Sequence, residues 1–155
     1  MKNRYFQSKI DYLDLLFNYF DNLSIDEYHR SHIAKYITVI ISGVYEDLVK
    51  KGIEDFLNDN NIKVEVKNYI NNTLKKSFRN PDAGNLKSLL KSFSKDWFDK
   101  ITSLGADKVA ALDSVVNNKN LIAHGQNCNI TYLELKDYYV KTREILTALD
   151  EIFTK

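Results

Sequence analysis

Residues 33–56 read Ile33-Ala-Lys-Tyr-Ile-Thr-Val-Ile-Ile-Ser-Gly-Val-Tyr-Glu-Asp-Leu-Val-Lys-Lys-Gly-Ile-Glu-Asp-Phe56, and this stretch decides the fold class. Its β-branched segment, residues 37–41, would suit a buried strand if it stood alone. Apolar residues at intervals of three and four continue on both sides of that segment, however, and no cluster of turn residues interrupts them. The spacing therefore predicts one long helix. Its apolar face contains Ile33, Ile37, Ile40, Val44 and Leu48.

Helical spacing extends on either side of this stretch. Upstream, residues 8–22 carry apolar side chains at helical intervals, and Ser24-Ile-Asp-Glu27 fits a capping box that would begin the long helix. Downstream, the polar cluster 58–61 ends the long helix. The apolar residues that follow predict a third helix over about 66–78.

Two breaks divide the second half of the chain. The loop 79–84 contains Pro81, which disfavours helix at the residue before it, and Gly105 interrupts the chain again. Thr131-Tyr-Leu-Glu134 fits a second capping box. The predicted helices are 85–94, 96–103, one from about 109 that ends near Asn117 to Asn120, and a terminal one that the second capping box opens. We therefore expect a single all-α domain over residues 1–155, an antiparallel helical bundle of about four long helices plus short ones.

Composition narrows the classes of function. The 155 residues include 22 Lys and Arg against 21 Asp and Glu, so the net charge of +1 disfavours a polybasic membrane binder or a general DNA coat. The single cysteine, Cys128, rules out an intrachain disulfide framework and suits a reducing compartment. The sequence shows neither a signal peptide nor an apolar run of membrane-spanning length. We expect a cytoplasmic protein that does not contact a membrane.

The segment Asn118-Lys-Asn-Leu-Ile-Ala-His-Gly125 is the strongest candidate for chemistry. It gathers a cation, an amide and an imidazole between two predicted helices. A helix would separate Lys119 from His124 by about 140°. If both serve one site, the helix must end between them, or two chains must each contribute part of the site. A histidine before a glycine is also common at the end of a helix, where it has only a structural role.

A resemblance favours the functional interpretation. Lys119-Asn-Leu-Ile-Ala-His-Gly125 resembles the Arg-Asn-x-x-Ala-His-Gly signature of the HEPN superfamily. The segments Ser42–Leu48 and Ile130–Tyr139 resemble the RiboL-PSP-like branch of that superfamily, and the likeness covers about residues 30–153. It implies a dimeric helical bundle that in many members is a metal-independent endoribonuclease of toxin–antitoxin or anti-phage systems, with the paired motifs facing each other across the dimer.

The resemblance also implies roles for individual residues. His124 would transfer protons, Lys119 would bind the phosphate, Asn120 would orient it, and Glu46 would align His124 or Lys119. The site would need no cofactor and no metal, and RNA would be the substrate because only RNA has the attacking 2′-hydroxyl. Lys119 replaces the arginine of the signature and lacks its bidentate fork. The alternative is therefore a catalytically weak or inactive module that binds RNA or a partner protein, such as an antitoxin.

Charge is unevenly distributed along the chain. Residues 63–100 contain nine Lys or Arg and four Asp or Glu, a balance of +5, which leaves −4 for the remainder. Such a segment could guide RNA, although a solvated helix surface is the more frequent reason for it. The best candidates for RNA contacts are Lys75, Lys76 and Arg79, beside the 79–84 loop.

Other reactive residues give weaker patterns. His29 and His32 are three residues apart on a predicted helix, but the sequence offers no third or fourth metal ligand near them. Cys128 lies close to His124 without an evident third group to orient it, so a small structural cysteine is the favoured interpretation.

Overall fold

The computed structural model describes residues 1–154, and they form seven α-helices without a strand. The all-α prediction is confirmed, as is the prediction of about four long helices with shorter ones between them. The helices are α1 (Arg4–Asp21), α2 (Glu27–Asp59), α3 (Val64–Ser77), α4 (Ala83–Phe93), α5 (Lys95–Thr102), α6 (Ala106–Ala123) and α7 (Tyr132–Phe153).

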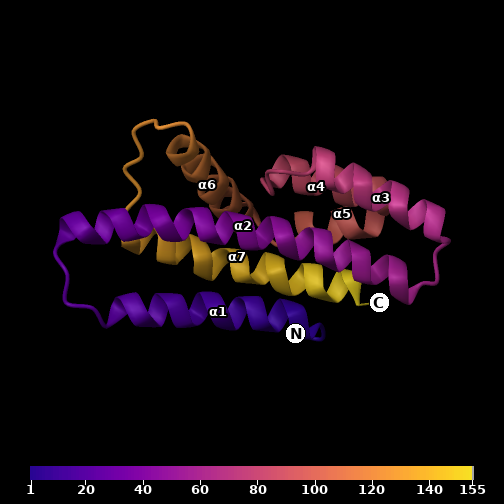
Figure 1. The fold of residues 1–155 in the computed structure, drawn as a ribbon, viewed down its shortest axis with the longest axis horizontal. Coiled ribbons are helices and arrows are strands. Elements are labelled where there is room, and N and C mark those ends of the chain that lie inside the picture. The colour runs from indigo at the N-terminus through magenta and orange to yellow at the C-terminus, as the bar shows by residue number, and fades with distance from the viewer. Residues whose placement is uncertain (155) are drawn as a thin grey trace.

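Helices α1, α2 and α7 form a three-helix core, in which α2 runs the length of the molecule and α1 and α7 lie along part of it (Figure 1). Helices α2 and α7 are parallel to each other, and α1 is antiparallel to both. The register of the parallel pair is set by two contacts: the Tyr45 hydroxyl meets the Thr142 hydroxyl at 2.5 Å, and the Phe153 ring lies against the backbone of Gly52. A Cβ at Gly52 would be 2.1 Å from that ring, so only glycine fits there without displacement.

Tyrosine–aspartate hydrogen bonds attach α1 to the core. The Tyr139 hydroxyl donates to Asp14 at 2.7 Å, and the Tyr132 hydroxyl donates to Asp21 at 3.1 Å. Burial, together with the neighbouring carboxylate, raises the pKa of both phenols above the ordinary value. The buried carboxylate of Asp150 accepts from the backbone N–H groups of the residues just before α1.

The remaining helices cover the opposite side of α2 and α7. Helix α6 packs on both through Leu112, Val115 and neighbouring buried residues. The short helices α3, α4 and α5 gather beside the C-terminal half of α2. There the Trp97 ring stacks on Phe93, with centroids 5.4 Å apart. Within residues 1–154, none of the helices combines the length and apolar character that crossing a bilayer requires.

Some helices begin earlier or elsewhere than the sequence predicts: α1 begins at Arg4 and not at residue 8, α6 begins at Ala106 and not near 109, and α2 has a different cap. The predicted capping box at Ser24 is wrong: α2 begins at Glu27, and its N-cap is Asp26, whose side chain accepts from the His29 N–H. Asp is as good an N-cap as Ser, so Asp26 can take the role that the sequence assigned to Ser24. The second capping box is confirmed, because Thr131 and Glu134 exchange hydrogen bonds at the start of α7.

Candidate functional site at the end of α6

The motif segment lies on the last turns of α6 and not in a loop. The prediction that this helix ends near Asn117 to Asn120 is wrong, because regular helix continues to Ala123. Gly125 ends it with a φ of +63°, a conformation that glycine adopts readily. Its N–H donates to the Ile122 carbonyl, and the next N–H donates to the Leu121 carbonyl, which together form a Schellman motif. We refer to residues 118–126 as the motif end.

His124 is the C-cap residue of α6, and its side chain is exposed to solvent. Its backbone N–H closes the last helical turn by donating to the Asn120 carbonyl at 3.0 Å. Across residues 1–154, its imidazole ring has no hydrogen-bond or ion-pair partner. The ring is therefore open to a ligand, as a proton-transfer group must be.

Lys119 is half-buried, and it is held by amide oxygens instead of carboxylates. Its ammonium donates to the Asn80 side-chain oxygen at 2.8 Å and to the Asn120 side-chain oxygen at 3.3 Å. Within the described part of the chain, no Asp or Glu forms an ion pair with it. Amide dipoles orient the ammonium without cancelling its charge, so Lys119 keeps a full positive charge that an anion can share.

Lys119 and His124 do not meet within one chain. Because α6 continues past Lys119, the two side chains leave the helix in directions about 140° apart. The first of the two conditions given by the sequence, a helix end between them, is therefore not met. A site that uses both groups requires the other condition, in which two chains each contribute one of them.

The loop after the motif end is anchored back onto α6. The thiol of Cys128 donates to the Asn118 side-chain oxygen at 3.3 Å, and Cys128 is buried. The neighbouring Ile130 is buried as well. This contact gives Cys128 a structural role and fixes the segment that leads from His124 to α7.

Glu46 lies on α2 and pairs with a different residue from the one we expected. Its carboxylate accepts from the Lys50 ammonium at 2.5 Å, and both side chains are half-buried. No hydrogen bond or ion pair joins Glu46 to Lys119 or His124 within residues 1–154. In the single chain, Glu46 therefore neutralises Lys50.

The three expected RNA contacts lie at the end of α3 and just beyond it. Lys75 and Lys76 occupy the last turn of α3, and Arg79 follows the buried Phe78; all three basic side chains are exposed. Asn80, the residue after Arg79, is the one that holds the Lys119 ammonium. The structure thus connects the basic segment to the motif end through a single hydrogen bond.

Asn80 is the site residue that the sequence did not indicate. It precedes Pro81 in an irregular loop, where asparagine is common for reasons of turn geometry alone. Thirty-nine residues separate it from Lys119, so no local spacing joins the two. Its position before Pro81, which holds it out of helix, was the only signal available.

The two histidines of α2, His29 and His32, contact residues that are close to them in the sequence. The His29 Nδ1 atom is 2.8 Å from the Asp26 carboxylate, and the His32 ring lies edge-on to Tyr28. Among residues 1–154, no group of three or more His, Cys, Asp and Glu side chains has an arrangement that could hold a metal ion.

Comparison with protein families gives one result that covers nearly the whole chain. A family model described as RiboL-PSP-HEPN matches residues 5–155. A search of curated proteins and a search of solved structures each found no match.

Proposed function

The chain belongs to the RiboL-PSP-HEPN family, and from this membership we propose that it acts on RNA as a metal-independent endoribonuclease. The observation that carries the proposal is the pair of groups available to a ligand at the motif end: an exposed imidazole at His124 and an ammonium at Lys119 that no carboxylate of residues 1–154 neutralises. These are the two kinds of group that phosphodiester cleavage at a 2′-hydroxyl requires.

Cleavage begins when the 2′-oxygen of a ribose attacks the adjacent phosphorus. The proton of that hydroxyl must leave, and the departing 5′-oxygen must receive one. Imidazole, with an ordinary pKa of ~6.5, performs both transfers at neutral pH, so His124 is assigned the proton-transfer role. The products are a 5′-hydroxyl and a 2′,3′-cyclic phosphate.

Negative charge builds up on the phosphoryl oxygens as the 2′-oxygen bonds to phosphorus. Lys119 stabilises that charge, because its ammonium is positioned before the substrate arrives and does not have to leave an ion pair. The Asn120 side chain accepts from Lys119 through its oxygen, which leaves its NH₂ group to donate to a phosphate oxygen. Glu46, which pairs with Lys50, is assigned to the site only if the dimer brings it to His124 or Lys119.

We place the active site at a homodimer interface. Lys119 and His124 diverge on one helix, so Lys119 of one protomer and His124 of its partner have to converge on the same phosphate. The biological role that fits such an enzyme is the toxin or effector of a bacterial toxin–antitoxin or defence system in the cytoplasm, restrained by a partner protein until it is needed.

The decisive experiment is an RNA cleavage assay in the presence of a metal chelator. We expect wild-type protein to produce 2′,3′-cyclic phosphate ends, and His124→Ala to slow cleavage by about 100-fold or more. His32→Ala is the matched control, because it removes another exposed imidazole that lies on α2, and we expect its cleavage rate to equal the wild-type rate. Thermal unfolding should give the same Tm for all three proteins.

The second candidate function is a binding module without catalysis, and the lysine at position 119 is the observation that favours it. Lysine binds phosphate as a point charge and lacks the two parallel donors of arginine. Intact RNA after prolonged incubation with the wild-type protein would support the binding module. In that case Lys119→Arg, which restores the arginine of the signature, should produce cleavage.

A further inference from the structure

We propose that the groove between α2 and α3 binds a phosphate of the RNA strand on its way to the motif end, with Lys75 as the principal contact. This inference rests on the proposed function, and it identifies where the substrate lies outside the site of cleavage. The groove has a volume of about 270 Å³. It is lined by Asp47, Lys50, Lys51, Glu54, Asn71, Leu74 and Lys75.

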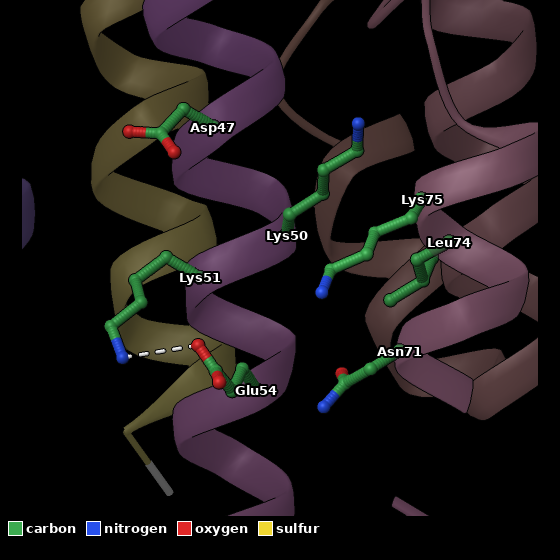
Figure 2. Close-up of a pocket in the computed structure, with 7 residues that line it drawn as sticks. All are labelled: Asp47, Lys50, Lys51, Glu54, Asn71, Leu74 and Lys75. Atoms are coloured by element: carbon green, nitrogen blue, oxygen red, sulfur yellow. Dashed lines mark hydrogen bonds and ion pairs between the residues drawn. The ribbon is translucent and has the colours of Figure 1, made fainter. Parts of the chain in front are cut away.

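The side chains that point into the groove between α2 and α3 are two cations and an amide. Figure 2 shows Lys50, Asn71 and Lys75 pointing into the space between the two helices. Asp47 and Glu54 also line the groove, and in the same view both extend from α2 on the side away from α3. An anion between the helices therefore faces the donors of Lys50, Asn71 and Lys75, and the two carboxylates of the lining must be accounted for.

The carboxylates of the groove are already satisfied. Asp47 accepts from the Tyr5 hydroxyl at 2.5 Å and lies 3.2 Å from the Lys9 ammonium. Glu54 pairs with Lys51, whose ammonium lies 3.2 Å away. The neighbouring cations largely cancel both negative charges, so the carboxylates repel a phosphate in the groove only weakly.

Lys75 is the groove cation that has no such partner. The Lys50 ammonium is shared with Glu46, and Lys51 is shared with Glu54 and Asp55. For Lys75, residues 1–154 provide neither an ion pair nor a hydrogen bond. The Lys75 ammonium can therefore attract a phosphate with its full charge. The Lys50 ammonium attracts it more weakly, because Glu46 offsets part of its charge.

The groove is connected to the motif end through the chain itself. Lys75 lies on the last turn of α3, and Asn80, five residues later, holds the Lys119 ammonium at 2.8 Å. Five residues span at most about 17 Å even when fully extended. Arg79 lies between them and is exposed. An RNA strand of a few nucleotides is long enough to contact Lys75, Arg79 and Lys119 in turn.

A lysine-lined groove contacts the backbone and not the bases. An ammonium binds any phosphate as a point charge, so this contact supplies affinity and position without reading the sequence. When Lys75 is removed, we expect the affinity for RNA to fall. The fall should depend on the salt concentration, and it should be the same for different RNA sequences.

The test measures binding of a single-stranded RNA oligonucleotide by fluorescence anisotropy, with every protein carrying His124→Ala so that the RNA stays intact. We expect Lys75→Gln to weaken binding by about three- to tenfold at low salt and to reduce the slope of log K against log salt by about 0.7. Lys63→Gln is the matched control, because it removes an exposed lysine at the opposite end of α3. Lys63→Gln should lose clearly less RNA affinity than Lys75→Gln.

A second comparison separates a groove from a diffuse basic surface. Lys76→Gln removes the neighbouring charge of α3, but this residue does not line the groove. Equal losses for the Lys75 and Lys76 variants, or an unchanged affinity for Lys75→Gln, would overturn the proposal. Binding of an acidic peptide in place of RNA would overturn it too. Because the RNA is never cut in this assay, the result is independent of whether the wild-type protein is a nuclease.

Discussion

The three-helix core and the motif end of α6 differ in how their polar side chains are paired. In the core, polar groups are matched: Tyr139 donates to Asp14, Tyr45 meets Thr142, and the buried Asp150 carboxylate accepts two backbone N–H groups. At the motif end, the partners of Lys119 among residues 1–154 are amide oxygens, and the His124 ring is exposed.

The difference shows which groups hold the fold and which are left for a ligand. A matched polar pair in the core stabilises the helices that it joins, and removing one member leaves the other unsatisfied. A charge without a counter-charge adds little to folding, but it is free to bind a charged substrate. Substitutions in the core should therefore change stability, whereas substitutions at the motif end should change activity.

The largest effect is expected from mixing two inactive variants. Lys119→Ala and His124→Ala homodimers should each be inactive, and co-expression should restore about a quarter of the wild-type cleavage rate, because half of the dimers contain one complete shared site. The measurement is the cleavage rate of the co-purified mixture. Activity that stays at the level of the separate variants would contradict a site built from two chains.

The core should respond most strongly at Gly52. In Gly52→Ala the new Cβ meets the Phe153 ring at 2.1 Å, so we expect the free energy of unfolding to fall by about 1–3 kcal/mol. Gly43→Ala is the matched control on the same helix. It meets nothing within 4 Å, and it should stabilise α2 by up to about 1 kcal/mol. Chemical denaturation followed by circular dichroism measures both, and a stabilised Gly52→Ala variant would show that the ring moves freely.

A smaller effect is expected at Tyr139. Tyr139→Phe removes the hydrogen bond to Asp14 and should lower the free energy of unfolding by about 1 kcal/mol at pH 7. The folded protein raises the pKa of Tyr139, so the wild type loses stability as the pH rises above the ordinary phenol pKa of ~10. Tyr139→Phe has no hydroxyl to ionise at this position, so its free energy of unfolding does not fall for this reason as the pH rises.

The difference in stability between the two proteins should therefore narrow above pH 10. Denaturation midpoints at pH 7, 9 and 10.5 provide the measurement. A difference that stays constant over this range would indicate that the hydroxyl ionises equally well in the folded and unfolded states.

Much of the fold follows from local patterns in the sequence. The long apolar periodicity across residues 33–56 predicts α2, and the Thr131–Glu134 box marks the start of α7 correctly, because both features depend on residues that are neighbours along the helix. The end of α6 was harder to predict. The polar run at residues 117–120 is typical of a helix end, but Gly125 provides the actual stop through its positive φ.

The site was only partly predictable for a related reason. The motif identifies Lys119, Asn120 and His124, since they lie within six residues of one another. The partner of Lys119 is Asn80, and the partner of Glu46 is Lys50. The first contact depends on how the loop before α4 lies against α6, which no local spacing records. The second contact joins two residues that are four apart on one helix, which is an ordinary spacing for an ion pair. The sequence does not show that Glu46 pairs with Lys50 and not with Lys119 or His124.

The attachment of the first helix to the last has a consequence for biosynthesis. Helix α1 and the residues just before it bind α7 across 111 to 148 residues of chain, through Tyr132, Tyr139 and Asp150. A growing polypeptide whose α7 is still inside the ribosome cannot complete the core, and the apolar faces of α1 and α2 stay uncovered until then. For the proposed nuclease this order delays function, because the motif end cannot take its final place before α7 has left the ribosome.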